Sequence, residues 1–433
     1  MKVMLLYPEV SDMARFKEGR KEFPPFGVLY LAAVLEQHDY EVAIRKVTPD
    51  EYTLDLRGYD AVGFSLASSA TYGMMLQARD HSLFRDDALI MVGGVHAGFY
   101  PKDSLVDFRA DVVSYGESDE TILEILERYE SRRFEGITGV MWCRGDTIVR
   151  ESPTVLMRDI SLLPMPARHL LPQEDFLMRD RLAGTDLLMA HVMFSRGCPF
   201  PCGFCAAGQK RIQYRSGASA RAELLHLKET YGIQGFAIVD DNFVVARQKV
   251  LEICRSIADL DLRWSALSRV DTVDEEVIAA MAAAGCIEIK FGMESGSERM
   301  LKAMRKNTTQ AQICKAIELA NKYGIQAKVF IIHGYPGENL ESTRETIELL
   351  RQLGTMIARV SLFPFVPLPG TSVYDQPGIR GTHLRSDWDG QWDKFHIHHN
   401  EGRWWGSDDE WAEVQAGYRE LRQFVEATWN SQG

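Results

Sequence analysis

Residues 191–205 read HVMFSRGCPFPCGFC and join an apolar strand to a compact run of three cysteines. We predict the strand over 191–197, and the loop after it holds Cys198, Cys202 and Cys205 at C-x3-C-x2-C spacing. Iron–sulfur clusters usually take four cysteine ligands. Three thiolates leave one iron of a [4Fe–4S] cluster open, and an open iron can chelate the amino and carboxylate groups of a methionine moiety. A cluster placed in this way can pass one electron to a sulfonium.

A zinc site and a chance grouping of cysteines are the alternatives. Zinc normally takes a fourth Cys or His at motif spacing and favours C-x2-C pairs, and the sequence has no second pair. His191 is close in sequence but lies inside the predicted strand. An odd count of seven cysteines in a long chain is not typical of a disulfide framework. The other four are predicted to be buried apolar residues: Cys143, Cys254, Cys286 and Cys314.

The chain beyond the cysteine loop alternates strands with helices. A helix is predicted over 220–231, with Ser219 as a candidate N-cap. Two later helices end at a glycine in the C-cap position. Further strands are predicted at 235–241, 262–270, 287–294, 326–335 and 358–365. Six such β/α units favour an open (β/α)6 partial barrel over residues 191–375, with its chemistry at the carboxyl ends of the strands.

Residues 1–145 show a second alternating series. Strands are predicted at 2–7, 41–47, 61–67, 88–94 and 111–116, with helices at 26–40 and 120–130. This alternation predicts a doubly wound, Rossmann-like parallel sheet. Ligands of such sheets bind at the carboxyl ends of the strands. The corresponding segments here are Tyr7-Pro8, Ser65 to Ser69, Gly93 to His96, and Gly116-Glu117.

Two segments do not follow either series. Residues 146–190 are predicted to be a connector, because the phrase LLPMPARHLLP has three prolines in eleven residues. Residues 376–433 are predicted to form a short, mainly helical, Trp/His-rich cap over the barrel, or simply to pack the final helix onto it. Aromatic faces suit sugar-like ligands. The region holds Trp388, Trp392, Trp404, Trp405, Trp411 and Trp429, with His396, His398 and His399.

The bulk composition narrows the function classes. The 433 residues suggest two or three domains, and 45% hydrophobic with 25% charged residues is typical of a globular protein. A net charge of −12 argues against a nucleic-acid partner. The sequence has no apolar run of the ~18 residues that a membrane helix needs. The N-terminus is interpreted as a strand and not as a signal peptide, so we expect no membrane association and a cytoplasmic location.

The cysteine loop resembles the signature of the radical S-adenosylmethionine (SAM) superfamily. Over roughly residues 1–375 the chain resembles the class of that superfamily with an N-terminal cobalamin-binding domain. The phrases that carry this resemblance are PPFGVLYLA (24–32), GGVHA (93–97), YGE (115–117), LPMPA (163–167), DDNF (240–243), FGMESG (291–296), GYPGE (334–338) and PGT (369–371).

The resemblance implies roles in binding SAM. Phe204 should lie against the adenine, and Asp240 and Asp241 should meet the methionine amino group. Glu294 and Ser295 suit the ribose hydroxyls or the methionine moiety. Arg269 could pair with the methionine carboxylate, and the turn that begins at Gly334 can shape the adenine pocket. A structural hydrogen bond or a surface charge is the alternative for each residue.

The resemblance also implies cobalamin in the first domain. The motif D-x-H-x-x-G, which supplies an axial histidine, is absent from the sequence, and the class that the chain resembles commonly lacks it. The segments that would face the corrin or its nucleotide tail contain Ser65, Gly93, Gly94, His96, Gly116 and Glu117. His96 is interpreted as a polar contact rather than a metal ligand. A domain that keeps the fold but has lost the cofactor is the alternative.

The function that the resemblance implies is reductive cleavage of SAM at the cluster. The resulting 5′-deoxyadenosyl radical would abstract hydrogen from a natural-product or sugar-like small molecule, most simply for cobalamin-dependent C-methylation. The alternatives are a radical dehydratase, deoxygenase or epimerase with a cobalamin-free first domain, and a non-catalytic iron–sulfur carrier or sensor. We expect a flavodoxin or ferredoxin as the reducing partner.

Overall fold

The computed structural model describes residues 1–9, 23–154, 156–157, 159–208, 210–376, 378, 392, 395 and 403–430. The chain divides into two compact units. The first comprises residues 1–176 together with the described residues of 387–396, and the second begins at residue 177 and includes the C-terminal helix. We call them the N-terminal unit and the barrel unit.

The N-terminal unit is built on one seven-stranded sheet in the order β2-β1-β3-β4-β5-β6-β7. Strands β1 to β5 run parallel, and β6 and β7 extend the sheet as an antiparallel hairpin. The strands are β1 (Lys2–Pro8), β2 (Glu41–Val47), β3 (Ala61–Ser65), β4 (Leu89–Gly93), β5 (Val112–Ser114), β6 (Val140–Arg144) and β7 (Thr147–Arg150). The sheet therefore confirms the predicted doubly wound architecture.

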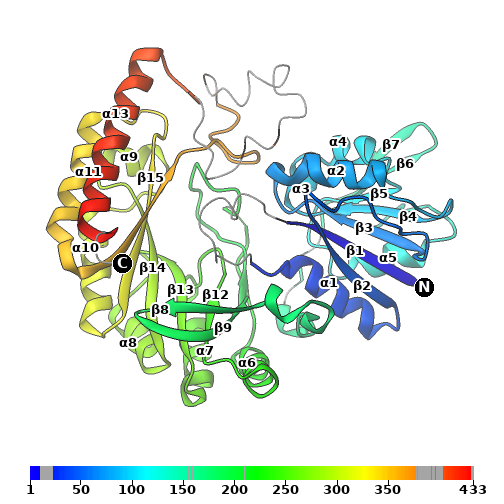
Figure 1. The fold of residues 1–433 in the computed structure, drawn as a ribbon, viewed down its shortest axis with the longest axis horizontal. Coiled ribbons are helices and arrows are strands. Elements are labelled where there is room, and N and C mark those ends of the chain that lie inside the picture. Colours follow the sequence, from blue (N-terminus) through cyan, green and yellow to red (C-terminus); the bar gives the residue numbers. More distant parts are fainter. Residues whose placement is uncertain are drawn as a thin grey trace. The chain divides into compact units, whose positions relative to one another are not determined.

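Helices cover both faces of this sheet (Figure 1). One face carries α2 (Tyr72–His81), α3 (Val95–Phe99) and α4 (Pro101–Asp107), and the other carries α1 (Phe26–Gln37) and α5 (Thr121–Glu127). The strands are apolar on both faces because both are covered, as in β1, whose residues after Lys2 are all buried up to Tyr7. The order of the strands reverses between β1 and β3, and a parallel sheet binds ligands beside such a point.

The barrel unit contains a second seven-stranded sheet, in the order β16-β15-β14-β13-β12-β9-β8. β8 pairs antiparallel with β9, and the other six strands are parallel, as the six predicted units require. The strands are β8 (Leu177–Leu182), β9 (Thr185–Val192), β12 (Gly235–Ile238), β13 (Arg263–Arg269), β14 (Cys286–Glu294), β15 (Gln326–His333) and β16 (Ile357–Pro364). A short ribbon of β10 (Ser195–Arg196) and β11 (Gln213–Tyr214) brackets the cysteine loop.

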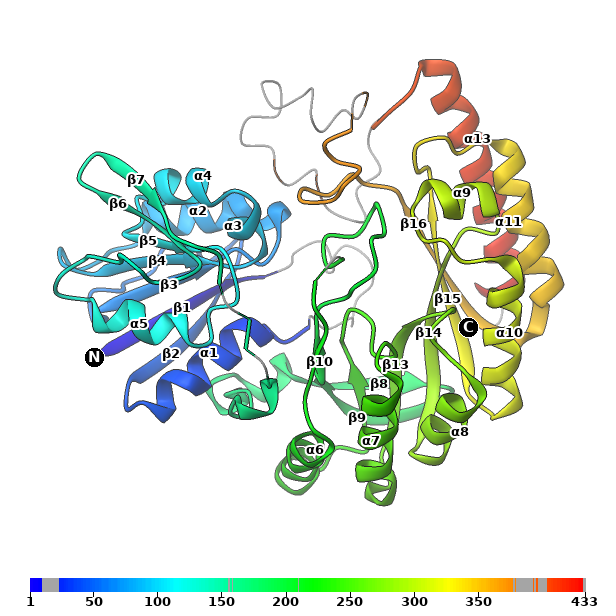
Figure 2. The same cartoon turned by 180° about the vertical axis from the view of Figure 1, so that it is seen from behind.

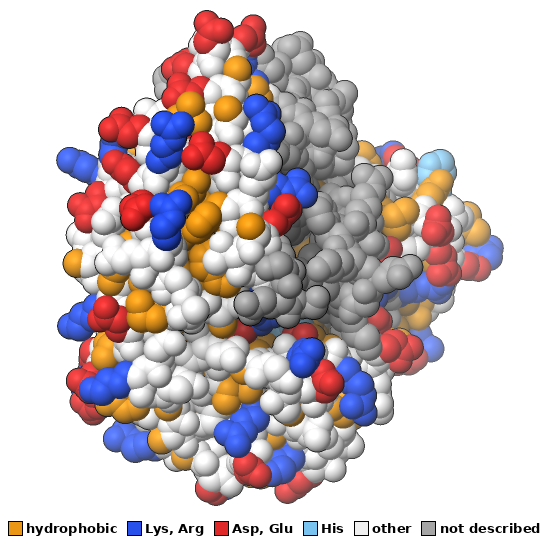
Figure 3. All heavy atoms as spheres, turned by 60° about the vertical axis from the view of Figure 1, so that its left-hand side comes forward, with side chains coloured by type: hydrophobic (Ala, Val, Ile, Leu, Met, Phe, Trp, Pro, Cys, Tyr) orange, Lys and Arg blue, Asp and Glu red, His pale blue; other side chains and the backbone are white. Residues whose placement is uncertain are grey.

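Helices line the outside of this curved sheet (Figure 2). They are α6 (Gly217–Tyr231), α7 (Arg247–Ile257), α8 (Glu275–Ala283), α9 (Glu298–Ala303), α10 (Gln310–Lys322) and α11 (Leu340–Leu353). α13 (Asp408–Val425) lies beside α11, where the Leu340 amide donates to Glu413 Oε1 at 2.9 Å. The face that these outer helices present carries lysine, arginine and carboxylate side chains intermixed (Figure 3). Short helical turns lie at Ser69–Thr71, Ile160–Leu162, Arg168–Leu170, Gln173–Asp175, Ala258–Leu260, Gly354–Met356 and Glu426–Asn430.

Several local predictions differ from the structure. The N-cap of α6 is Ser216, whose hydroxyl accepts from the Ser219 amide, so Ser219 itself lies in the first turn. The predicted connector contains β7, β8 and most of β9, which begins at Thr185 and not at the predicted residue 191. β7 and β8 each have an antiparallel partner that a local pattern does not reveal. In the described part of the chain, no helix is long and apolar enough to cross a membrane.

Candidate functional site

The cysteine loop is tied into the barrel unit by backbone hydrogen bonds. The Lys210 amide donates to the Cys198 carbonyl at 2.9 Å, which closes the loop on itself. The Gly203 amide donates to the Met304 carbonyl at 2.8 Å, and the Gly203 carbonyl accepts from Val373 at 3.1 Å. These bonds join the loop to the segment after α9 and to the chain beyond β16. The loop is therefore held by two segments that lie far along the chain and not only by the strand that precedes it.

The three cysteines of the loop are all at least half-buried. Of the other four, Cys254 and Cys286 are buried as predicted, whereas Cys143 is exposed and Cys314 is half-buried. Cys198 is buried, and Cys202 and Cys205 are half-buried. Burial raises the pKa of Cys202, although the positive charges of Lys306 and Arg269 oppose that rise, and burial raises the pKa of Cys205 to about 11. Thiolates must form before metal can bind, and iron would supply the charge that stabilises them. The loop therefore fits iron ligation.

Nothing in the geometry marks a single-ion site. Among the described residues, no group of three His, Cys, Asp or Glu side chains is arranged to hold one metal ion. A cubane presents a separate iron to each cysteine, so its ligands lie farther apart than those of one zinc ion.

Asp240 holds the residues that lead into the cysteine loop. It follows β12, and its two oxygens accept from the Phe194 amide at 2.9 Å and from the Ser195 hydroxyl at 2.6 Å. Burial raises the pKa of Asp240 to about 7, and these hydrogen bonds oppose the rise. Asp241 is exposed, with Lys210 nearby. The expected contact with the methionine amino group stays a prediction, for which Asp241 is the accessible carboxylate of the two.

Arg269 ends β13 and lies against the cysteine loop. Its Nη1 donates to Cys202 Sγ at 3.1 Å, and its guanidinium lies 4.0 Å from the centre of the Phe200 ring. Asp271 accepts from Nε and Nη2 at 2.8 Å each, and the Lys306 carbonyl accepts from Nη2 at 2.8 Å. The sequence located this arginine at the site, but its contacts with Cys202 and Lys306 depend on the tertiary fold.

Glu294 ends β14 in an unusual conformation. Its φ is +64°, in the left-handed region, and the pairing with β15 shifts register between Gly292 and Glu294. Glu294 Oε1 accepts from Lys306 Nζ at 2.8 Å, and the two side chains are 8% and 5% exposed. A Cβ at Gly292 would lie 2.8 Å from that ammonium and closer still to Glu294 Oε1, so a side chain there would force the pair to shift. Lys306 was not predicted, because it follows a helix and no strand end marks it.

The remaining predicted SAM contacts lie at neighbouring strand ends. The Ser295 hydroxyl shares a hydrogen bond with Thr346 at 3.2 Å and accepts from the Ser297 amide, so it serves the local turn. The Gly334 carbonyl, after β15, accepts from the Trp405 indole at 2.7 Å. Phe204 is half-buried beside Cys205. Their expected contacts with SAM stay predictions.

The C-terminal tryptophans that the structure describes mainly pack the chain end. Trp404 and Trp405 are buried, and Trp405 bonds to the turn at Gly334 as given above. The Trp429 indole donates to the Ile357 carbonyl at the start of β16. These contacts favour the packing interpretation over a ligand surface. Trp388, His396, His398 and His399 lie outside the described residues.

In the N-terminal unit, the carboxyl ends of β3 and β4 meet. Ser65 pairs with Gly93 in the sheet, and the Leu66 amide donates to the Gly93 carbonyl at 2.7 Å. Gly94 has φ +100°, and a Cβ there would lie 2.7 Å from the Leu66 carbonyl oxygen. Only glycine fits so close an approach in that conformation. The turn places His96 at this edge of the sheet.

His96 is fully buried and held as a neutral ring. Burial lowers its pKa to about 4, and its Nδ1 lies 2.9 Å from the Ser69 hydroxyl. Nε2 has no hydrogen-bond partner among the described residues. Three aromatic rings surround it, with centroids at 4.5 Å (Tyr72), 4.8 Å (Trp392) and 5.1 Å (Tyr100). Trp392 was predicted as part of the cap, but in the structure it contacts the N-terminal unit.

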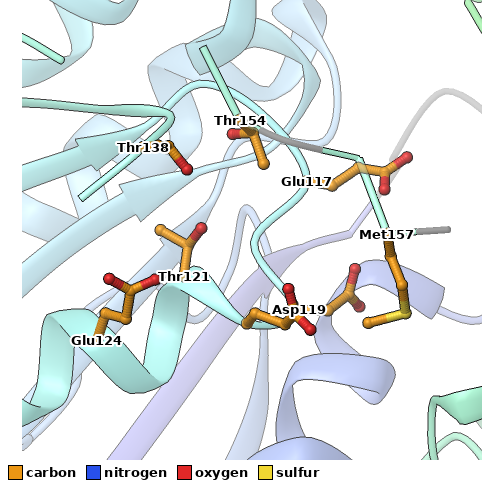
Figure 4. Close-up of a pocket in the computed structure, with 8 residues that line it drawn as sticks. Glu117, Asp119, Thr121, Glu124, Thr138, Thr154 and Met157 are labelled. Carbon is orange, nitrogen blue, oxygen red and sulfur yellow. The ribbon is translucent and has the colours of Figure 1, made fainter. Parts of the chain in front are cut away.

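Gly116 and Glu117 lie beside a small cavity of about 70 Å3, which Figure 4 shows between α5 and the chain after β7. Thr154 packs directly on Gly116. The lining is rich in carboxylates and hydroxyls: Glu117, Asp119, Glu120, Thr121, Glu124, Thr138, Thr154 and Met157. The expected contact of Gly116 and Glu117 with cobalamin stays a prediction.

Comparison with known proteins follows this division of the chain. The radical SAM superfamily matches residues 192–350, and the B12 binding domain matches residues 17–126. An uncharacterized methyltransferase of Pyrococcus horikoshii is 29% identical over 401 residues, which cover 90% of this chain and 85% of that protein. The cytidylyl-2-hydroxyethylphosphonate methyltransferase of Streptomyces wedmorensis is 26% identical over 438 residues, covering 86% of this chain and 80% of that protein.

A solved structure shares the fold. The radical SAM methyltransferase TsrM of Kitasatospora setae, with cobalamin and a [4Fe–4S] cluster bound, aligns with a TM-score of 0.70 and 16% sequence identity. The alignment covers 99% of this chain and 88% of that one. At this identity the likeness supports the arrangement of elements and nothing finer.

The chain is a radical SAM enzyme, as the matched domain and the cysteine loop of its half-barrel define. Within that superfamily it belongs to the class with an N-terminal cobalamin-binding domain. Its cofactors are a [4Fe–4S] cluster, SAM and cobalamin. A cobalamin-free first domain and a non-catalytic iron–sulfur carrier are not favoured.

Proposed function

We propose that the chain is a cobalamin-dependent methyltransferase that adds a methyl group to a carbon atom of a small molecule. The observation that carries the proposal is the combination of a B12-binding domain and a radical SAM domain in one chain. Two relatives named methyltransferases match this chain over more than four fifths of its length. A radical dehydratase or epimerase would not need the first domain.

The barrel unit offers the groups that such a reaction requires. When bound, the cluster and SAM supply a 5′-deoxyadenosyl radical that abstracts hydrogen from an unactivated carbon, and cobalamin carries the methyl group. Cys198, Cys202 and Cys205 hold three irons. Asp241 and Glu294 provide carboxylates for the ammonium and hydroxyl donors of SAM. The buried strand ends around these residues exclude water from the reacting groups.

The N-terminal unit holds cobalamin at the carboxyl edge of its sheet. Ser65, Gly93 and Gly94 let backbone approach the corrin, and the neutral ring of His96 offers a polar contact beside it. His96 already uses Nδ1 with Ser69, and aromatic rings enclose it. We therefore assign it to positioning rather than to cobalt ligation.

The substrate in this proposal is a natural-product or sugar-like small molecule. The reduction of SAM consumes one electron, so a one-electron donor such as a flavodoxin or ferredoxin must deliver it. Figure 3 shows surface charges of both signs, so a small electron-transfer protein could form ion pairs with either positive or negative side chains.

The test separates methyl transfer from radical formation. Protein is purified without oxygen from cobalamin-fed cells, and iron, sulfide and cobalt are quantified on one sample. Reduced enzyme is then incubated with SAM bearing a deuterated methyl group, and S-adenosylhomocysteine and 5′-deoxyadenosine are measured. Cobalamin-dependent formation of S-adenosylhomocysteine, with label on the cobalamin, supports the proposal. Formation of 5′-deoxyadenosine alone, at equal rates with and without cobalamin, refutes it.

A further inference from the structure

Arg269 has almost no hydrogen-bonding capacity left for a ligand. A guanidinium carries five N–H donors. Four are used, two with Asp271, one with the Lys306 carbonyl and one with Cys202 Sγ. The side chain is 7% exposed, and the Phe200 ring covers one face of the guanidinium at 4.0 Å. The group is therefore fixed in the folded chain before any ligand arrives.

This arrangement leaves no edge of the guanidinium with two free N–H groups to bind a carboxylate. Arginine binds carboxylates best through two parallel N–H bonds. Asp271 occupies the edge formed by Nε and Nη2. On the other edge, Nη2 is committed to the Lys306 carbonyl and Nη1 points one of its two protons at Cys202. The single remaining proton, on Nη1, cannot form the paired contact that the methionine carboxylate would require.

The orientation instead directs positive charge at a cluster ligand. Asp271 accepts from Nε and Nη2, which leaves Nη1 to donate to Cys202 Sγ at 3.1 Å. Lys306 adds a second cation near Cys202, while its carbonyl helps to hold Arg269. Hydrogen bonds to cluster sulfurs and the net charge nearby are two of the factors that set the reduction potential of an iron–sulfur cluster.

We propose that Arg269 is a positioning residue for the cluster, acting through Cys202. Its N–H···S hydrogen bond and buried charge stabilise the reduced cluster relative to the oxidised one, because reduction adds negative charge to the sulfurs. Asp271 sets the rotation of the guanidinium, and the loop around Met304 and Lys306 fixes its distance. This inference rests on the radical SAM assignment and is independent of methyl transfer.

The test is the reduction potential of the cluster measured without SAM. Arg269→Gln removes the positive charge. Arg269→Lys keeps the charge but lacks the planar guanidinium with its several N–H donors. Arg247→Gln is the matched control. Arg247 also pairs with an aspartate, Asp274, but at 40% exposure on the surface. The potential is read from the electron paramagnetic resonance signal of the reduced cluster during a redox titration, with iron content checked on each sample.

Arg269→Gln should lower the equilibrium constant for cluster reduction about tenfold, which is ~59 mV for a one-electron couple. Arg269→Lys should fall between that variant and the natural protein, and Arg247→Gln should match the natural protein. Because SAM is absent, a role in binding its carboxylate cannot produce the shift. An unchanged potential in Arg269→Gln, especially with weakened SAM binding, would overturn the proposal.

A second measurement applies if the Arg269 variants do not retain their cluster. The natural protein is labelled with 15N in its arginine guanidinium groups and reduced, and pulsed electron paramagnetic resonance records the nitrogen coupling to the cluster. A coupling from one guanidinium nitrogen is expected, since Nη1 lies 3.1 Å from Cys202 Sγ. The absence of any arginine coupling would reject the assigned hydrogen bond without a mutation.

Discussion

Replacing Lys306 by methionine should leave the Glu294 carboxylate buried without its cation. The two side chains are 5% and 8% exposed, and Nζ and Oε1 lie 2.8 Å apart. Removing one partner of a buried ion pair typically costs about 3–5 kcal/mol, because the remaining charge is uncompensated. Methionine keeps the unbranched stem of lysine, which limits the loss of packing. We therefore expect Lys306→Met to lower the free energy of unfolding by about 3–5 kcal/mol.

The assay is urea unfolding of the cluster-free protein without oxygen, followed by tryptophan fluorescence and by circular dichroism. Lys322→Met is the matched control, since Lys322 pairs with Glu275 at 60% and 55% exposure. An exposed pair of this kind contributes little, so the control should unfold with the natural protein. The double variant Lys306→Met/Glu294→Gln should recover most of the lost stability, because it leaves no unpaired charge.

Two results would contradict this reasoning. If Lys306→Met unfolds at the same urea concentration as Lys322→Met, Glu294 is not desolvated in the way that its exposure indicates. If the double variant is as unstable as the single one, the loss comes from packing and not from the charge.

Three further predictions concern the cofactors and the pH dependence. Cys202→Ala should lose its iron–sulfur absorbance completely while Cys254→Ala keeps it, and a Cys202→Ala protein that still cleaves SAM would reject the ligand assignment. Burial raises the pKa of Glu338 to about 7; the folded state then binds a proton that the unfolded state releases, so the contribution of Glu338 to stability falls as pH rises from about 5 through 7. Glu338→Gln should remove this contribution, so the difference in unfolding free energy between the variant and the natural protein should change with pH over this range in urea titrations, and a constant difference would contradict it. The Trp392 ring packs on His96, which we propose contacts cobalamin, so Trp392→Ala should weaken cobalamin binding about tenfold in equilibrium dialysis. Trp411→Ala should not, and equal affinities would contradict the proposed role of His96.

The architecture was predictable because it depends on local patterns. Alternating apolar runs and helical stretches identified both parallel sheets, and the prediction of six β/α units is confirmed by the parallel strands of the barrel unit. The strands β6, β7 and β8 were not predicted, and β9 begins six residues before the strand predicted at 191–197. β7 and β8 each gain their stability from an antiparallel neighbour, and their sequences are short and mixed in polarity. Cross-strand pairing, not the segment's own pattern, decides such strands.

The candidate site was predictable in its positions but not in its contacts. The strand-end rule located Asp240, Arg269 and Glu294, because parallel strands bring their carboxyl ends together. It could not locate Lys306, which reaches Glu294 only through the turn after α9. It also could not show that Trp392, far along the chain, contacts the ring of His96. Each contact joins residues from different elements of the fold, and a periodic pattern within one segment does not predict it.

The network at Cys202 explains why these charges lie in the interior at all. Arg269 and Lys306 would be costly to bury alone, yet each is paired with a carboxylate, and the positive charge of each opposes the rise in the pKa of Cys202. Glu294 adopts a left-handed backbone conformation and Gly292 has no side chain. These two features leave room for the Lys306 ammonium. Simple structural salt bridges could be replaced by apolar residues with little loss. A pair of cations retained beside a metal ligand, with strained backbone to accommodate one of them, is better explained by the charge of the cluster than by the stability of the fold.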